Sequence, residues 1–168
     1  METAQRIPAE KRLRLRLRQQ VNWGRTALLA MLAITLLNQV LLMLHVEYHF
    51  LISAAVPYYL NWLVRQLGAT GAFPALATVV TLGLYAGYAA CWLMSAQRKE
   101  WLIAALGLYG LDTLLLIIFS VTMLKSPASC LLEILTHGVV IAVLVMAVRA
   151  AEQLSRMPRS RRMPVRES

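Results

Sequence analysis

The sequence predicts an all-α, polytopic membrane protein whose four transmembrane helices form one compact bundle. Hydrophobic residues make up 59% of the 168 residues, and the mean hydropathy of +0.60 lies far above that of a soluble domain. Four apolar segments reach the roughly 20 residues that a helix needs to cross the hydrocarbon layer. They lack the in–out alternation of barrel strands, so helices are the expected spanning form. The expected spans cover residues 26–45, 73–95, 101–124 and 130–150.

A basic segment precedes the first span and covers residues 1–25. Its stretch KRLRLRLRQQVNWGR, wound as a helix, places Leu13, Leu17 and Val21 on one stripe and spreads arginines over the remaining surface. This amphipathic pattern predicts contact with membrane lipids through their anionic headgroups. Nucleic acid is not expected as a partner, because no stacking aromatics are interleaved with the charges. A cleaved signal peptide is not expected either, because no small-residue cleavage site follows the first span.

The positive charges predict that both termini are cytoplasmic. Of the 17 Lys and Arg residues, 15 lie before the first span, between the second and third, or after the fourth. Only Arg65 and Lys125 fall in the other two loops. The positive-inside rule therefore places loops 46–72 and 125–129 outside and predicts a multi-pass protein of the cell membrane. The tail at 151–168 is basic and lacks an apolar period, so we expect it to be cytoplasmic and disordered.

The outer segment at 46–72, between the first and second spans, is unusually apolar for a loop. Pro57, Asn61 and Arg65 nevertheless interrupt it too often for a fifth span. We therefore expect an interfacial or re-entrant piece. Its aromatic residues suit an interfacial belt, which favours simple anchoring, and a lid over a cavity is the sharper alternative. These aromatic residues are Tyr48, Tyr58, Tyr59 and Trp62.

Asp112 stands in the apolar stretch LYGLDTLLLIIF, near the middle of the third span. An ionisable group at that depth usually faces a bundle interior or a wet cavity, so we expect it to be partnered, hydrated or protonated. On the fourth span, Glu133 and His137 are spaced i, i+4 and share one face at a similar level. The expected ligand-binding residues are Asp112, His137, Glu133, Tyr85, Asn38, Thr113, Tyr58 and Tyr59.

Polar side chains in membrane helices also hold the helices together. For Asn38, Thr113 and the tyrosines we favour this structural role, and for Asp112 we favour a functional one. Glu133 has a further simple explanation, because an acid in the first turns of a helix complements its dipole.

His45, Glu47 and His49 form a second candidate site, for a metal, at the outer end of the first span. If the first helix continues through them, the two histidines lie one turn apart on one face. Their spacing matches no established zinc signature, and interfacial hydrogen bonding is the simpler interpretation. Gly83 and Gly87 form a GxxxG pair that lets helices approach closely, either within the bundle or in a homo-oligomer.

Three stretches resemble a group of small four-span membrane proteins of Gram-positive bacteria. They are FLISAAVPYYL, LDTLLLI and LLEILTHGVVIAVLVMAVRAAEQL, and the resemblance covers roughly residues 26–154. It implies the four-span fold, but no activity, because none is assigned to the group. Carried over position by position, it points to Ser53, Pro57, Tyr58, Tyr59, Asp112, Thr113, Glu133 and His137.

Three functional hypotheses follow. The favoured one is a small transporter-like or channel-like protein that binds an ion, a proton or a small amphipathic solute in the outer half of the bundle. The second is a membrane-embedded enzyme acting on lipid or an outer-leaflet substrate, with His137 as acid or base. The third is an accessory or scaffold subunit. Covalent and ATP-driven chemistry are not expected, because no serine or cysteine is placed as a nucleophile and no GxxxxGK[ST] loop occurs. The sequence predicts no particular cofactor.

Overall fold

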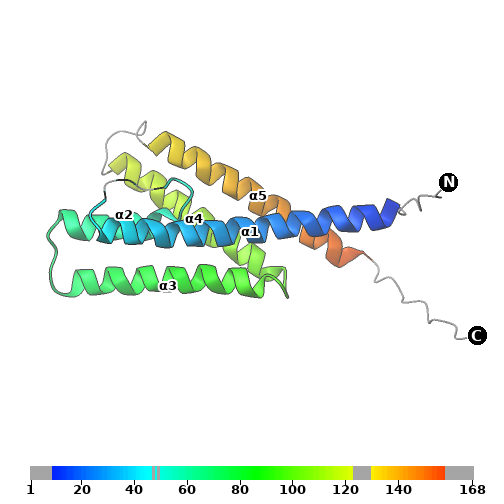
Figure 1. The fold of residues 1–168 in the computed structure, drawn as a ribbon, viewed down its shortest axis with the longest axis horizontal. Helices are drawn as coiled ribbons and strands as arrows, with labels where there is room; N and C mark the ends of the chain where they lie inside the picture. The colour runs from blue at the N-terminus through cyan, green and yellow to red at the C-terminus, as the bar shows by residue number, and fades with distance from the viewer. Residues whose placement is uncertain (1–8, 47, 49, 123–129, 158–168) are drawn as a thin grey trace, which may run out of the picture.

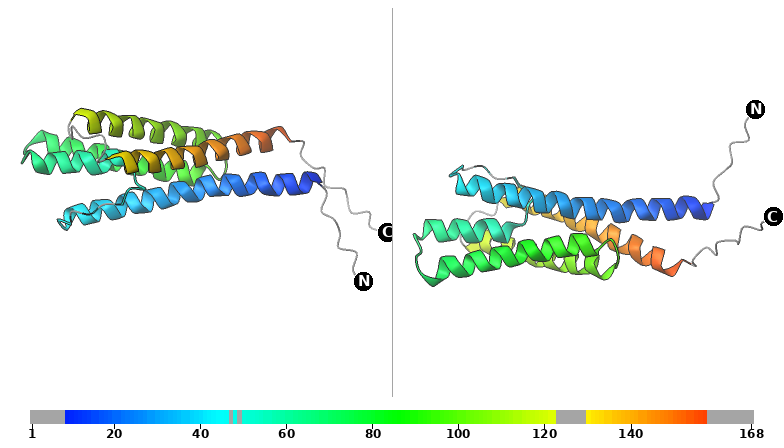
Figure 2. Two further views of the ribbon diagram at one scale, coloured as in Figure 1. Left: turned by 90° about the horizontal axis from the view of Figure 1, so that it is seen from above. Right: turned by 60° about the horizontal axis from the view of Figure 1, so that its bottom comes forward.

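The computed structural model describes residues 9–46, 48, 50–122 and 130–157. Its five helices are α1 (Ala9–Met43), α2 (Ala55–Gln66), α3 (Ala72–Met94), α4 (Glu100–Thr122) and α5 (Leu131–Arg156). The predicted all-α class is confirmed. Four long helices run along one axis, and the short α2 lies beside them (Figures 1 and 2).

The four long helices, α1, α3, α4 and α5, are long and apolar enough to cross a membrane, as predicted. A helix of 23 residues such as α3 is about 35 Å long at about 1.5 Å per residue, enough for a hydrocarbon layer of roughly 30 Å. Their bounds lie close to the predicted spans except in α1, which is 35 residues long, and at the end of α5, which continues to Arg156 into the tail expected to be disordered. The basic stretch continues the helix of the first span, and Glu10 pairs with Arg14 one turn later.

All four long helices expose large apolar side chains. A third or less of the most apolar window of each long helix is buried. A surface this apolar is compatible with a multi-pass membrane protein, in which lipid contacts the outside of the bundle. Examples of exposed side chains, one from each long helix, are Leu36, Val79, Leu114 and Val139.

α1 and α5 pack closely because small residues meet where they cross. The buried residues of α1 recur at spacings of three and four, from Gly24 to Leu42, which places them on one face. A Cβ added to Gly24 would lie 2.3 Å from the Cβ of Ala147 on α5. The glycine is therefore needed for the observed approach of the two helices.

The two ends of the bundle differ in what they connect. We call the end where α1 begins and α5 finishes the terminal end; the turn 95–99 between α3 and α4 lies there too (Figure 1). We call the opposite end, where α4 finishes and α5 begins, the far end. The apolar core occupies much of the terminal half, with Leu28, Tyr88, Leu102 and Leu144 among its buried members.

Between α1 and α2 the chain turns back into the bundle. α1 ends at Met43, and His45 then adopts a positive φ of 61°. α2 begins beside Asp112, in the middle of α4, and runs with α4 toward the far end, where Trp62 contacts Phe119. We call residues 50–56, which lead into and begin α2, the returning segment.

Candidate functional site

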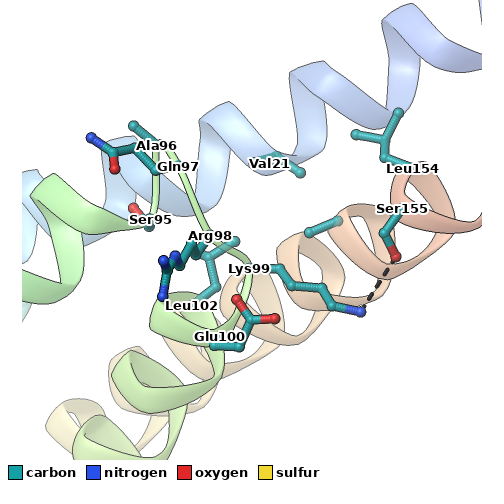
Figure 3. Close-up of a pocket in the computed structure, with 11 residues that line it drawn as sticks. Val21, Ser95, Ala96, Gln97, Arg98, Lys99, Glu100, Leu102, Leu154 and Ser155 are labelled. Atoms are coloured by element: carbon teal, nitrogen blue, oxygen red, sulfur yellow. Dashed lines mark hydrogen bonds between the residues drawn. The ribbon is translucent and has the colours of Figure 1, made fainter. Parts of the chain in front are cut away.

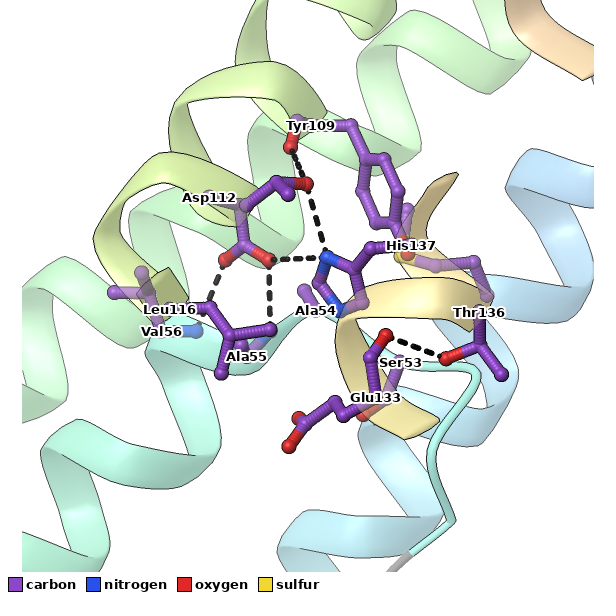
Figure 4. A network of polar contacts seen from close by, with 12 residues as sticks. Ser53, Ala54, Ala55, Val56, Tyr109, Asp112, Leu116, Glu133, Thr136 and His137 are labelled. Carbon is purple, nitrogen blue, oxygen red and sulfur yellow. Dashed lines mark hydrogen bonds and ion pairs between the residues drawn. The ribbon is translucent and has the colours of Figure 1, made fainter. Parts of the chain in front are cut away.

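Asp112 caps the N-terminal end of α2. Its side chain is 2% exposed and points from α4 toward the first turn of α2 (Figure 4). Oδ2 accepts a hydrogen bond from the Ala55 N–H at 2.8 Å, and Oδ1 accepts one from the Val56 N–H at 2.9 Å. The next residue, Pro57, has no N–H. The carboxylate therefore satisfies the free amides of this helix end and complements the positive end of its dipole.

Two side chains of α1 hold the returning segment from the other side. The Asn38 side-chain oxygen accepts a hydrogen bond from Phe50 N at 2.7 Å, and its Nδ2 donates to Phe50 O at 2.7 Å. The same Nδ2 donates to Ser53 Oγ at 2.9 Å. Thr35 Oγ1 accepts from Ala54 N at 2.8 Å. Asn38 thus pairs with the Phe50 backbone much as a neighbouring strand would.

α5 adds a further contact to the same segment. The Thr136 hydroxyl donates to Glu133 O at 2.7 Å and lies 3.2 Å from Leu51 O, which can share this proton as the weaker acceptor. Side chains from α1, α4 and α5 therefore supply hydrogen-bond partners for non-helical backbone enclosed in the bundle. Such backbone is stable away from water only when its polar groups are satisfied in this way.

His137 lies beside Asp112 and is completely buried. Its ring stacks on Tyr109 with centroids 4.8 Å apart, and its Nδ1 lies 2.9 Å from Thr113 Oγ1 and 4.0 Å from Asp112 Oδ2. The Thr113 hydroxyl donates its proton to Tyr109 O at 2.8 Å. Its oxygen can therefore accept a hydrogen bond from Nδ1–H of His137. Nε2 lies near the Ser53 backbone but makes no hydrogen bond of normal geometry within the described part of the chain.

A second buried acid, Glu133, lies in the first turn of α5. Its Oε2 accepts a hydrogen bond from the Tyr59 hydroxyl at 2.7 Å, and the Cys130 sulfur lies 3.9 Å from the same hydroxyl. Burial, together with the charge of Glu133, raises the pKa of the Tyr59 phenol. The phenol therefore keeps its proton and serves as the donor. This pair ties α2 to the start of α5.

The predicted site residues divide into two groups. The structure gathers six of them around the returning segment and the start of α2: Asn38, Tyr59, Asp112, Thr113, Glu133 and His137. Tyr58, in the first turn of α2, lies beside them: its ring meets that of Tyr59 edge-on with centroids 5.3 Å apart, and it lines a pocket with Trp62 and Arg65. Tyr85 lies elsewhere and lines a pocket of about 450 Å³ between α1, α2 and α3.

The condition for the predicted metal site is not met. α1 ends at Met43 and does not continue through residues 45–49. Glu47 and His49 lie outside the described residues, and the His45 ring contacts the Arg65 guanidinium, whose charge opposes a metal cation. Across the described ranges, no three His, Cys, Asp or Glu side chains are close enough to hold a metal ion.

Three contributors were not predicted. Thr35 and Thr136 bond the returning segment, and a signal existed for Thr35, which lies three residues before Asn38 and so shares its helical face. Arg65 donates to Leu42 O at the C-terminal end of α1. A cation there complements the negative end of the helix dipole, just as Asp112 complements the positive end of α2.

No family model, curated protein or solved structure matches this chain. The resemblance to small four-span proteins of Gram-positive bacteria therefore stays a prediction. The interpretation of the site rests on its own geometry.

Replacing Asn38 by leucine, which has a similar volume, is expected to release Phe50 from α1. The amide of Phe50 should exchange its hydrogen roughly 10-fold faster or more, because each of the lost bonds contributes about 0.5–1.5 kcal/mol. Hydrogen–deuterium exchange of the purified protein measures this rate. Asn22→Leu is the control, because Asn22 is an exposed residue of the same helix. Equal exchange in both variants would contradict the role given to Asn38.

Proposed function

We propose that this is a small transporter-like or channel-like membrane protein in which Asp112 and His137 bind a proton. The proton controls how firmly the returning segment and α2 are held in the bundle. One observation carries this proposal: a buried carboxylate is the partner of both amides at the start of α2.

Placed in a bilayer, the returning segment is re-entrant. The four apolar helices set the membrane axis, and α2 starts beside the middle of one of them. Both termini are then cytoplasmic, because most of the Lys and Arg residues lie at the terminal end or beyond it. Short helices that begin at mid-depth are a recurring way of building sites for ions and solutes inside membranes.

The closure of the site favours a proton over a larger ligand. Asp112 is 2% exposed and His137 is 0% exposed, so no solute molecule reaches them unless the returning segment moves. A proton needs a much smaller opening than a solute molecule does. The two groups lie 4.0 Å apart, so the proton affinity of each depends on the charge of the other.

Proton binding changes what holds α2. An ionised Asp112 makes two charge-assisted hydrogen bonds and faces the positive end of the helix dipole. A protonated Asp112 offers weaker acceptors and no charge, so the hold on Ala55 and Val56 loosens. Movement of α2 then alters the groove of about 300 Å³ between α2 and α4, through which a small amphipathic solute can enter.

Hydrogen exchange at Ala55 and Val56 tests the coupling. In the wild type, exchange at these amides, corrected for its intrinsic pH dependence, should accelerate as the pH falls and Asp112 takes up a proton. In Asp112→Asn, which stays neutral, the corrected exchange should be fast at every pH. A wild-type protein whose corrected exchange does not vary with pH would overturn the proposed coupling.

Proton movement is tested in liposomes that contain a pH-sensitive dye. The wild type should dissipate an imposed pH gradient faster than empty liposomes, and Asp112→Asn should lose this activity. Glu100→Gln is the matched control, because it neutralises an exposed acid of the same helix that does not contact α2. Wild-type liposomes no faster than empty ones, or full activity in Asp112→Asn, would show that the protein does not use Asp112 to move protons.

A further inference from the structure

A pocket of about 590 Å³ lies at the terminal end of the bundle (Figure 3). The turn between α3 and α4 forms one wall, and α1 and α5 form the others. This pocket is far from Asp112 and plays no part in proton binding. Its polar wall comes from the turn, which contributes Ser95, Gln97, Arg98 and Lys99.

The charges around the pocket are mainly positive. Arg98 and Lys99 line it, and Arg25 of α1 reaches Ser95 of the same turn, with Nε 3.3 Å from Oγ. The Lys99 ammonium donates to Ser155 Oγ at 3.3 Å across the mouth of the pocket. Glu100 also lines the pocket and opposes an anion. Two lining cations, with Arg25 nearby, against one lining acid leave a net attraction for a negatively charged group.

The opposite wall of the pocket is apolar. Val21 of α1 and Ala151 and Leu154 of α5 line it. The pocket therefore offers cations on one side and hydrocarbon contacts on the other. A free phosphate ion would use only the first of these, whereas a phospholipid would use both.

The geometry points to a binding site for one anionic phospholipid, with the headgroup phosphate against the turn that carries Arg98 and Lys99 and the upper acyl chain against α1 and α5. The site lies where α3 ends and α4 begins, which is the level of the headgroups if these helices cross the bilayer. It is independent of the proton site and does not rest on the proposed function.

Native mass spectrometry of the purified full-length protein tests this site. Phosphatidylglycerol is titrated against phosphatidylcholine with the same acyl chains, and the bound lipids are counted. Wild type should retain one phosphatidylglycerol more tightly than any phosphatidylcholine. The double variant Arg98→Gln/Lys99→Gln should bind it roughly 100-fold more weakly, since it loses two charge-assisted contacts with the phosphate, each contributing a factor of about ten or more.

The matched control is Arg12→Gln/Arg16→Gln, which also removes two positive charges but from exposed positions of α1 that do not line the pocket. It should stay within a few-fold of the wild-type affinity. Gln97→Glu adds a carboxylate to the pocket and should also weaken binding. It tests the site independently if the double variant folds poorly. Equal losses in the two double variants would indicate diffuse attraction and overturn the site. Displacement of the lipid by inorganic phosphate alone would indicate a phosphate site instead.

Discussion

Asp112→Ala is expected to lower the stability of the protein by roughly 3 kcal/mol or more, because two charge-assisted hydrogen bonds to α2 disappear. The amides of Ala55 and Val56 would remain buried without a partner, and the helix dipole would lose its counter-charge. The loss appears as a lower thermal midpoint in detergent, and unfolding of purified protein followed by tryptophan fluorescence measures it.

Two further variants separate the contributions of Asp112. Asp112→Asn keeps one acceptor oxygen and should lose only part of the stability that Asp112→Ala loses. The loss in Asp112→Asn reports the charge and the second hydrogen bond. Thr122→Val, at an exposed position of the same helix, should have almost no effect. An alanine variant as stable as the wild type would mean that Asp112 does not hold α2.

The second large effect is expected at the crossing of α1 and α5. In Gly24→Ala the new methyl group would lie 2.3 Å from the Cβ of Ala147, so the helices must separate. Overpacking of this kind costs about 1–3 kcal/mol. The thermal midpoint should fall accordingly, and Ala147→Gly in the same chain should restore much of it by making room.

Gly83→Ala is the matched control for the helix crossing. A Cβ at Gly83 meets nothing within 4 Å, so only the change in helix propensity remains, which favours alanine by up to about 1 kcal/mol. This variant should be as stable as the wild type or slightly more stable. If Gly24→Ala behaved like Gly83→Ala, the close approach of α1 and α5 would be refuted.

Much of the fold could be predicted, because long apolar runs have one stable form in a membrane. The predicted spans agree with α3, α4 and α5 to within a few residues, apart from the end of α5 at Arg156. The long extension of α1 was missed because the basic stretch reads as a separate surface segment. For residues 46–72 the sequence predicted an interfacial or a re-entrant piece but did not decide between them, since their apolar composition suits both a surface helix and a buried one.

The sequence predicted that the polar side chains lie inside the bundle. It did not predict which groups they bond. Asp112 and Asn38 bond mainly to backbone groups of the returning segment. Backbone amides and carbonyls occur at nearly every position, so a sequence does not indicate which of them a side chain will bond. The similar depth of the polar residues suggested contacts between their side chains instead. The same reasoning placed Tyr85 in the site, although the helical face that it occupies directs it to a pocket beside α2.

The hydrogen bonds of the returning segment also have an order in time. Residues 50–56 are synthesised well before Asp112 and Thr136, which supply some of their partners. Until the third and fourth spans leave the ribosome, these backbone groups have no complete set of protein partners and must stay in contact with water. The hydrogen bonds of the segment can therefore be completed only after α4 and α5 have been made.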